Sequence, residues 1–380
     1  MHIAVVGGGP AGCRVSQLLA QAGRQVTLLD AQGPWEKPCG GGVTSKALAL
    51  AGAVPPDLPR RAIETITVYF GDQLSVEFVP SEPLVVVSRK EFGVHLLQTA
   101  EAAGVRFVRE RVGSLARNGS GWTLGTRNAA IEADFVVGAD GATSFVRRQL
   151  GTPLTSEELN VTLGYFIAGK TGTNIKVFFL PTLEGYIWSF PRPDHLSYGL
   201  ITRPDPSWTS RYKTVLTNFI EADLGEDIFD QAEFYSAPVP GLGPHSWSEN
   251  HIAGDGWALL GDAAGLADPI TGEGIYYALR SAELLAETLG SPQDYIAAVA
   301  RDCVPELKRA SRMYRRFYSG RFAGVNFTKR MVQVARRSPT IRTILADLIA
   351  GSQPYIGLKR KLAWSIPRVA FDLVKSPFAR

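Results

Sequence analysis

The side chain with the most distinctive chemical setting is the thiol of Cys39, in the loop Lys37-Pro38-Cys39-Gly40-Gly41-Gly42-Val43. Three glycines directly after it leave little side-chain bulk, so a ring system or a substrate could approach the sulfur closely. A catalytic role needs an accessible thiol with an altered pKa, whereas most free cysteines are small buried hydrophobic residues. Both interpretations of Cys39 stay open at this point. The other two cysteines, Cys13 and Cys303, are expected to be structural.

A second candidate is the aromatic segment Tyr186-Ile187-Trp188-Ser189-Phe190. Its three rings alternate with other residues, so in a β-strand they all lie on one face of the sheet. Phe178 and Tyr165 are expected to join them from neighbouring strands. Such a face is either the core of a lobe or the wall of an elongated apolar pocket.

The tripeptide Gly272-Glu273-Gly274 stands immediately before an expected helix. Glycines allow backbone N–H groups to approach a ligand, and a helix N-terminus carries partial positive charge. The segment therefore predicts either a site for a negatively charged group or an ordinary N-cap.

These residues must be held in place by regular elements, and the first elements follow directly from the N-terminus. An apolar strand at residues 2–6 runs into a Gly-x-Gly-x-x-Gly turn, and a second strand at residues 26–29 ends in an acid. The glycines permit the tight turn, the approach of a pyrophosphate and close packing of the helix, while the acid can accept from a ribose hydroxyl. The expected dinucleotide contacts are Gly7, Gly9, Pro10, Ala11, Gly12 and Asp30.

Two later segments repeat the pattern of a strand followed by a turn. Residues 134–147 contain Gly138-Ala139-Asp140-Gly141, and residues 257–265 contain Gly261-Asp262, whose carboxylate suits a polyol hydroxyl. In this order, the three blocks resemble the FAD-binding set of the para-hydroxybenzoate-hydroxylase-like flavoproteins. The resemblance implies FAD as the cofactor. The further residues expected to hold it are Cys39, Gly41, Arg89, Val112, Asp140, Asp262, Gly272, Gly274 and Ile275.

Three motifs narrow the resemblance to the geranylgeranyl reductase family. They are Pro38-Cys39-Gly40-Gly41, the segment Pro269-Ile270-Thr271-Gly272-Glu273-Gly274-Ile275, and the aromatic strand that ends in Phe190-Pro191. Arg192 stands where a lysine is more usual in that family. The similarity covers roughly residues 1–300, and the last eighty residues carry no matching motif.

The resemblance implies an FAD-dependent reductase that saturates isolated C=C bonds of a prenyl chain by hydride transfer and protonation. Cys39, or a water that it orients, is then the expected proton donor, with Tyr186 as a weaker candidate, and the aromatic wall formed by Tyr165, Phe178, Trp188 and Phe190 becomes a substrate pocket. Expected substrates are a prenylated lipid, a quinone or a prenyl diphosphate, and NAD(P)H or reduced ferredoxin is the expected electron donor. The alternatives are a flavin monooxygenase or halogenase on the same scaffold, and a flavin-containing lipid-binding protein without turnover.

Composition restricts the class of protein further. The chain has 380 residues and few cysteines, and it contains no apolar run long enough to span a bilayer, so a cytoplasmic protein is expected. Its five histidines show no metal-ligand spacing.

Residues 301–380 hold 18 of the 40 Lys+Arg and only 4 of the 36 Asp+Glu. These basic residues recur beside apolar turns, which indicates either peripheral contact with the inner face of the membrane or a solvated basic face. Nucleic acid is not expected, because no recognition module accompanies the charge.

The predicted fold is α/β: a Rossmann-type FAD-binding lobe, an interleaved substrate lobe with an antiparallel sheet, and a helical C-terminal region. The predicted ranges are 1–60, 85–155 and 250–290 for the FAD-binding lobe, 61–84 and 156–249 for the substrate lobe, and 291–380 for the basic helical region.

Overall fold

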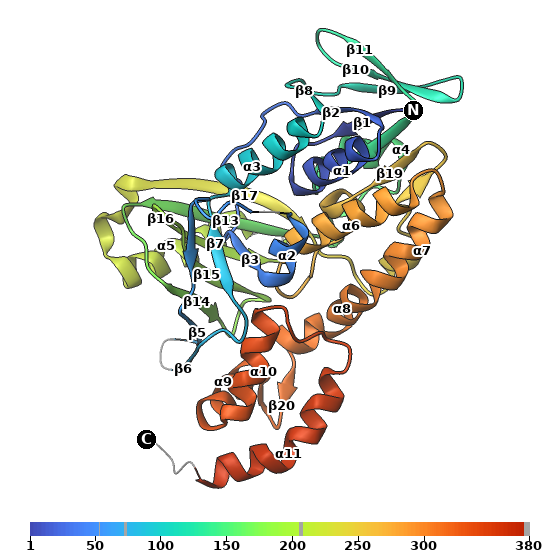
Figure 1. Ribbon diagram of the computed structural model, residues 1–380. Helices are drawn as coiled ribbons and strands as arrows, with labels where there is room; N and C mark the ends of the chain where they lie inside the picture. Colours follow the sequence, from blue (N-terminus) through green and yellow to red (C-terminus); the bar gives the residue numbers. More distant parts are fainter. Residues whose placement is uncertain (53, 72–73, 205–207, 376–380) are drawn as a thin grey trace.

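The computed structural model describes residues 1–52, 54–71, 74–204 and 208–375. The molecule is built around two large β-sheets, and a group of helices at the C-terminus extends beyond them (Figure 1). This arrangement confirms the predicted α/β fold. The predicted boundaries between the lobes stay a prediction.

The first sheet has six strands and is parallel except at one edge. The strand at its centre, β1, buries Ile3, Ala4 and Val5 completely, as expected for a strand covered on both faces. In spatial order the strands are β18 (Ala253–Gly254), β19 (Trp257–Leu259), β12 (Phe135–Gly138), β1 (His2–Val6), β2 (Gln25–Leu29) and β8 (Arg106–Val108). The helices of this lobe are α1 (Pro10–Gln21), α3 (Arg89–Ala102), α4 (Phe145–Leu150), α6 (Ile275–Thr288) and α7 (Pro292–Asp302), and Figure 1 shows α3, α1, α6 and α7 side by side in that order.

The second sheet has seven strands, all antiparallel except where β14 meets β5. In spatial order they are β17 (Ala232–Pro240), β13 (Leu159–Ala168), β16 (His195–Thr202), β15 (Gly185–Pro191), β14 (Asn174–Phe179), β5 (Thr65–Phe70) and β6 (Leu74–Phe78). The predicted turn between β5 and β6 includes residues 72 and 73, which lie outside the described residues. Helix α5 (Trp208–Leu224) packs on one face of this sheet through Leu216 and Ile220.

Helices of the C-terminal region pack on the opposite face of the second sheet. Helix α8 places Ala310, Tyr314 and Tyr318 in the same core cluster as Ile66, Val68 and Ile175 of the sheet. The helices of this region are α8 (Val304–Tyr318), α9 (Phe327–Arg337), α10 (Pro339–Ile349) and α11 (Leu358–Lys375). Both faces of the second sheet are therefore covered, one by α5 and the other by residues to which the sequence assigned no motif.

Smaller elements complete the chain. The remaining sheets are β3 (Gly42–Thr44), β7 (Leu84–Val87) and β4 (Arg60–Ala62); β11 (Ala130–Ala133), β10 (Gly121–Gly125) and β9 (Ser114–Asn118); and β20 (Arg321–Phe322) with β21 (Val325–Asn326). Short helices are α2 (Ser45–Leu50), η1 (Ser156–Glu158), η2 (Glu226–Gln231), η3 (Ser246–Ser248) and η4 (Gly261–Ala264). Within the described ranges, no helix is both long and apolar enough to cross a bilayer.

Candidate active site

A cavity of about 540 Å³ lies between the two sheets and reaches the C-terminal helices. Residues from both lobes and from α8, α9 and α10 contribute to its lining. The predicted site residues that line it are Gly9, Pro10, Ala11, Cys39, Gly41, Arg89, Tyr186, Trp188, Phe190, Asp262, Gly272, Gly274 and Ile275. Residues far apart in the sequence thus meet around a single space.

The N-terminus of α1 forms part of this lining. Gly12 allows the close packing that the fingerprint requires, because a Cβ there would lie 1.8 Å from the carbonyl oxygen of Gly7. A Cβ on Gly9 would meet nothing within 4 Å, and Gly9 has no side chain to cap the helix. Gly9, Pro10 and Ala11 at the start of α1 line the cavity, so this helix N-terminus is available to a phosphate group.

A second helix N-terminus, that of α6, also borders the cavity. Its N-cap is Gly274, which supplies no side-chain cap, and the carboxylate of Asp262 lies nearby on η4. The neighbouring Glu273 is held to one side, because it accepts from the Thr44 hydroxyl (3.0 Å) and pairs with Lys46 (3.1 Å). The partial positive charge at the N-terminus of α6 can therefore interact with a negatively charged ligand in the cavity.

The Cys39 sulfur accepts hydrogen bonds within the cavity lining. Nη1 of Arg89 donates to Sγ at 3.0 Å, and the backbone N–H of Gly41 donates at 3.2 Å. Burial disfavours the thiolate, but the guanidinium groups of Arg89 and Arg192 outweigh burial and lower the pKa of the Cys39 thiol. Cys39 is therefore more acidic than an ordinary cysteine. In contrast, burial raises the pKa of Cys13 and of Cys303 to about 12.

Arg192 holds the cysteine loop in its conformation. It is completely buried, and it donates to the carbonyl oxygens of Cys39 (2.7 Å), Gly40 (3.0 Å) and Val87 (2.8 Å) and to the carboxylate of Glu36. Gly41 has φ +83°, and a Cβ there would lie 2.5 Å from Nε of Arg192, so only glycine fits beside this side chain. The planar guanidinium has five N–H donors and binds these four acceptors at once, whereas a lysine ammonium has only three donors.

Glu36 completes this network, although no motif in the sequence pointed to it. Its carboxylate accepts from the Ser88 hydroxyl (2.8 Å) and from the backbone N–H of Arg89 (2.9 Å) at the start of α3. Burial opposes its ionisation, but Arg192 and these hydrogen bonds prevail and lower the pKa of Glu36. The only signal in the sequence was an acid before the cysteine loop, and nothing linked it to an arginine more than 150 residues away.

Tyr186, Trp188 and Phe190 of β15 line the cavity together, and Phe190 packs against the glycines of the cysteine loop. Tyr186 donates its hydroxyl to the carbonyl oxygen of Thr271 at 2.5 Å. Burial, with a smaller contribution from nearby Asp268 and Cys39, raises the pKa of Tyr186 well above its ordinary value. Tyr186 is thus a poor acid, while Cys39 is an enhanced one.

The prediction that Phe178 and Tyr165 belong to this wall is wrong. In the sheet, Phe178 is paired with Ile187 and Tyr165 with Tyr198, so both rings lie on the α5 face. Phe178 stacks on Tyr69 with ring centroids 4.4 Å apart. The cavity face of β14 instead presents Val177 and Phe179, because Val177 is the residue paired with Trp188.

Two of the residues predicted to bind FAD, Asp140 and Val112, lie outside the cavity lining. The carboxylate of Asp140 accepts from the Ser144 hydroxyl and from the backbone N–H of Phe145, so it stabilises the start of α4, and Val112 packs in the core of the first lobe. Asp30 ends β2 as expected, and its carboxylate accepts from the N–H groups of Gly8 (2.7 Å) and Gly33 (2.8 Å).

The apolar lining that comes from the C-terminal helices was not predicted. Phe317 and Tyr318 come from α8, Met331 from α9, and Leu345, Leu348 and Ile349 from α10. The sequence pattern showed amphipathic helices there but not what their apolar faces contact.

These residues can hold FAD. The two helix N-termini have no side-chain caps and face the cavity, Asp262 offers a carboxylate, and Nε of Arg89 is buried with no partner among the described residues. Anionic phosphates, ribityl hydroxyls and a polar ring edge are the groups that such an arrangement recognises.

Comparisons with known proteins agree with this assignment. A family model for an FAD binding domain matches residues 70–294. The digeranylgeranylglycerophospholipid reductase of Methanothrix thermoacetophila is 32% identical over 311 residues, which are 76% of this chain and 77% of the relative. The menaquinone reductase of Mycobacterium tuberculosis (strain ATCC 25618 / H37Rv) is 28% identical over 323 residues, covering 76% of each chain.

Among solved structures, a geranylgeranyl bacteriochlorophyll reductase-like protein from Thermoplasma acidophilum superposes with a TM-score of 0.77. It is 21% identical in sequence, and the match covers 95% of this chain and 98% of the other. At that identity the structural match concerns the fold. Together with the family match, these findings confirm the prediction of FAD as the cofactor.

Proposed function

The chain belongs to the geranylgeranyl reductase family of FAD-binding oxidoreductases, and from this premise we propose that it saturates isolated C=C bonds in a prenyl chain. The observation that carries the proposal is the continuity of one cavity. The same space is lined by Cys39 and the two helix N-termini in one part, and by apolar side chains of β14, β15, α8, α9 and α10 in another. A long hydrocarbon chain can enter only if such an apolar extension exists.

Two relatives favour a prenyl substrate. Their names specify digeranylgeranylglycerophospholipid and menaquinone, and both of these molecules carry polyisoprenoid chains. For this protein we propose the shared class: a prenylated lipid, a prenylquinone or a prenyl diphosphate. A bilayer is where most such molecules reside, so we also propose a peripheral location on the inner face of the membrane.

The reaction needs a hydride equivalent and a proton, and the bound cofactor in its reduced form supplies the former. One alkene carbon gains the hydride, the other gains the proton, and the π bond between them is lost. An isolated alkene is a poor electrophile, so the apolar wall must exclude water and hold the chain in position. Trp188 and Phe190 face the cavity from a rigid strand and are suited to this role.

Cys39 is the proton donor in this proposal. Its lowered pKa makes the thiol a stronger acid than an unperturbed cysteine, and Sγ borders the cavity. Arg89 and the N–H of Gly41 then stabilise the thiolate that remains after the proton has left. Tyr186, whose hydroxyl is engaged with Thr271 and whose pKa is raised, serves instead to position the segment before α6.

Each turnover oxidises the cofactor by two electrons, so an external reductant is required. We propose NAD(P)H bound transiently, or reduced ferredoxin, as that donor. The sequence contains one dinucleotide fingerprint, and FAD uses it.

An anaerobic product assay tests the proposal. The yellow protein, reduced with dithionite, is mixed with a panel of prenylated lipids, quinones and prenyl diphosphates, and products are identified by mass spectrometry. We expect a gain of two hydrogens per event, with reoxidation of the flavin. A gain of oxygen or halogen only after air and halide are admitted would assign the protein to the monooxygenases or halogenases. Lipid binding without any product would indicate a binding protein.

A further inference from the structure

Helix α11 differs from the other basic helices of the C-terminal region in what its apolar side chains contact. Helices α8, α9 and α10 bury theirs against the second sheet and line the cavity. In α11 only Leu358 is buried, whereas Trp364 is 83% exposed, Phe371 57% and Val374 84%. Figure 1 shows α11 at the end of the molecule farthest from the first sheet.

The exposed side chains of α11 form two parallel stripes. Trp364 and Phe371 are seven residues apart and therefore share one side of the helix. Arg368 and Lys375 follow the same seven-residue spacing directly beside them, and Nζ of Lys375 lies 4.4 Å from the centroid of the Phe371 ring. Lys361, one further step along this spacing, is paired with Asp347 of α10 (2.8 Å). An aromatic stripe bordered by cations is thus presented on the surface.

The single acid of α11 points back into the protein. Asp372 accepts from the Ser338 hydroxyl at 2.6 Å and from the backbone N–H of Thr340, both at the start of α10. This carboxylate is engaged at the start of α10, although Arg368 lies close enough to interact with it electrostatically, and the exposed charged residues of α11 are all basic.

We propose that α11 is a docking surface for an anionic phospholipid bilayer. Trp364, Phe371 and Val374 would enter the boundary between headgroups and acyl chains, while Arg368 and Lys375 contact lipid phosphates. The helix lies in the interface rather than spanning it, in agreement with the hydropathy of the described helices. A second copy of the chain fits this surface poorly, because a symmetric contact would place like charges against each other.

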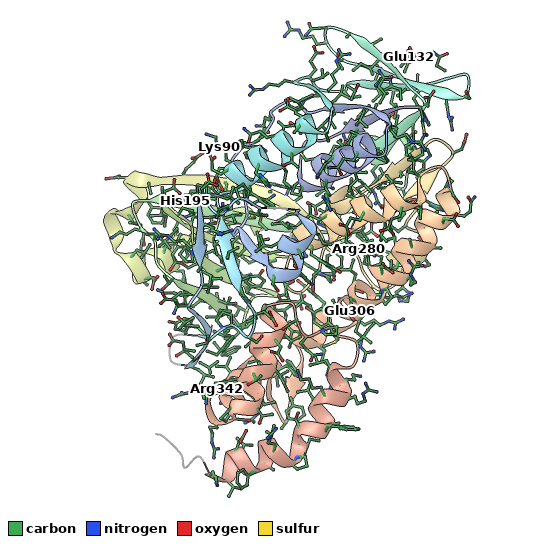
Figure 2. The ribbon with its side chains drawn as sticks, viewed as in Figure 1. Lys90, Glu132, His195, Arg280, Glu306 and Arg342 are labelled. Carbon is green, nitrogen blue, oxygen red and sulfur yellow. The ribbon has the colours of Figure 1, made fainter. Side chains whose placement is uncertain are left out.

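The position of α11 also connects this surface to the cavity. The loop before the helix contributes Gly351, Gln353 and Pro354 to the cavity lining, and Ile356 in the same loop is 52% exposed. Glu306 of α8, labelled in Figure 2, fixes the loop by accepting from the backbone N–H groups of Tyr355 (2.6 Å) and Ile356 (3.0 Å). If the proposed function holds, docking places this part of the cavity against the membrane that contains the substrate.

Flotation with lipid vesicles tests the docking surface directly. Full-length protein is mixed with vesicles of phosphatidylcholine alone or of phosphatidylcholine with phosphatidylglycerol. We expect flotation with the anionic vesicles, and a loss of at least about tenfold in affinity for the double variant Trp364→Glu/Phe371→Glu. Arg368→Glu/Lys375→Glu should lower affinity for anionic vesicles by about fivefold or more per residue while affecting neutral vesicles little.

A matched control is Ile296→Glu on α7, which changes an apolar side chain that is 42% exposed but lies outside α11. It should float like the wild type. Flotation of the Trp364→Glu/Phe371→Glu variant to the same extent as the wild type would overturn the proposal. A second result would also overturn it: the wild type is a dimer in sedimentation velocity, the variant is a monomer, and vesicle binding is the same for both. In that case α11 would contact a second copy of the chain.

The test is separable from the proposed function. Vesicle binding needs no turnover, so absence of a reduced product would refute the reductase and leave the docking result standing. Conversely, the α11 variants should reduce a short prenyl substrate dispersed in detergent at the wild-type rate. Loss of that activity together with vesicle binding would mean that the substitutions damage the fold, and circular dichroism would show it.

Discussion

Arginine and lysine serve two different purposes in two regions of this molecule. Around the cysteine loop, Arg89 and Arg192 are buried and each is committed to named acceptors of the protein. On α11, Arg368 and Lys375 are exposed to solvent. A buried cation needs acceptors close to it, because an unpaired charge in a low-dielectric interior is costly. An exposed cation acts through its field and tolerates change.

The largest effect is expected where the pairing is most complete. Glu36→Gln removes the carboxylate from the fully buried Arg192 and should lower the free energy of unfolding by about 3–5 kcal/mol, as measured by urea denaturation. Asp255→Asn is the control, since Asp255 pairs with Arg117 at the surface and should change stability by less than about 1 kcal/mol. Similar values for both variants would contradict the contrast between buried and exposed cations.

The same pair predicts a pH dependence of stability. The pKa of Glu36 is lower in the folded protein than in the unfolded chain, so its contribution is present above the ordinary pKa of a glutamate and is lost as the pH falls through the lowered value. The wild type should therefore lose stability on acidification more steeply than Glu36→Gln. Parallel curves for the two proteins would exclude this role for Glu36.

The next largest effect is expected from removing the thiol of Cys39. Cys39→Ala should slow anaerobic reduction of a prenyl substrate about 10²–10⁴-fold, the usual range for a lost general acid, while FAD stays bound. Cys303→Ala is the matched control because this cysteine lies outside the cavity lining. A Cys39→Ala enzyme that keeps nearly full activity would leave the protonation to another group.

Arg89 allows the electrostatic part of that role to be measured. Replacing it by methionine removes the cation that contributes most to lowering the pKa of Cys39, so the thiol should hold its proton to higher pH. Because the protonated thiol is the active form, the alkaline limb of the pH–rate profile should move to higher pH in Arg89→Met. A limb that stays in place would show that Cys39 is not the titrating group.

The smallest effect on folding is expected on α11. Arg368→Ala should change the free energy of unfolding by no more than about 0.5 kcal/mol, because the side chain is exposed. Its effect should be confined to binding of anionic vesicles. A large loss of stability would show that this cation is tied into the fold like those near Cys39.

The sequence predicted best what is local. The fingerprint at Gly7, Gly9 and Gly12 and the strand before Asp262 each depend on a few consecutive residues, and the structure has them as expected. Arg192 and Glu36 could not be paired in advance, because only the folded chain brings together residues so far apart.

The register of the strands was the second feature that the sequence could not predict. The spacing of Tyr186, Trp188 and Phe190 placed them on one face, but which face Phe178 shares depends on its pairing with Ile187, and a shift of one residue reverses that choice. The amphipathic pattern likewise could not distinguish α10, which lines the cavity, from α11, which is exposed.

The most direct test of the proposed reaction is a single anaerobic turnover in D₂O. Dithionite-reduced protein is mixed with one equivalent of a prenyl lipid, and the product is analysed by mass spectrometry. Hydride transfer from an exchangeable position of the reduced flavin plus protonation through an exchangeable thiol predicts two deuterium atoms across each saturated bond, with the flavin oxidised. Recovery of unchanged lipid beside flavin that stays reduced, for every prenyl class tested, would contradict the reductase.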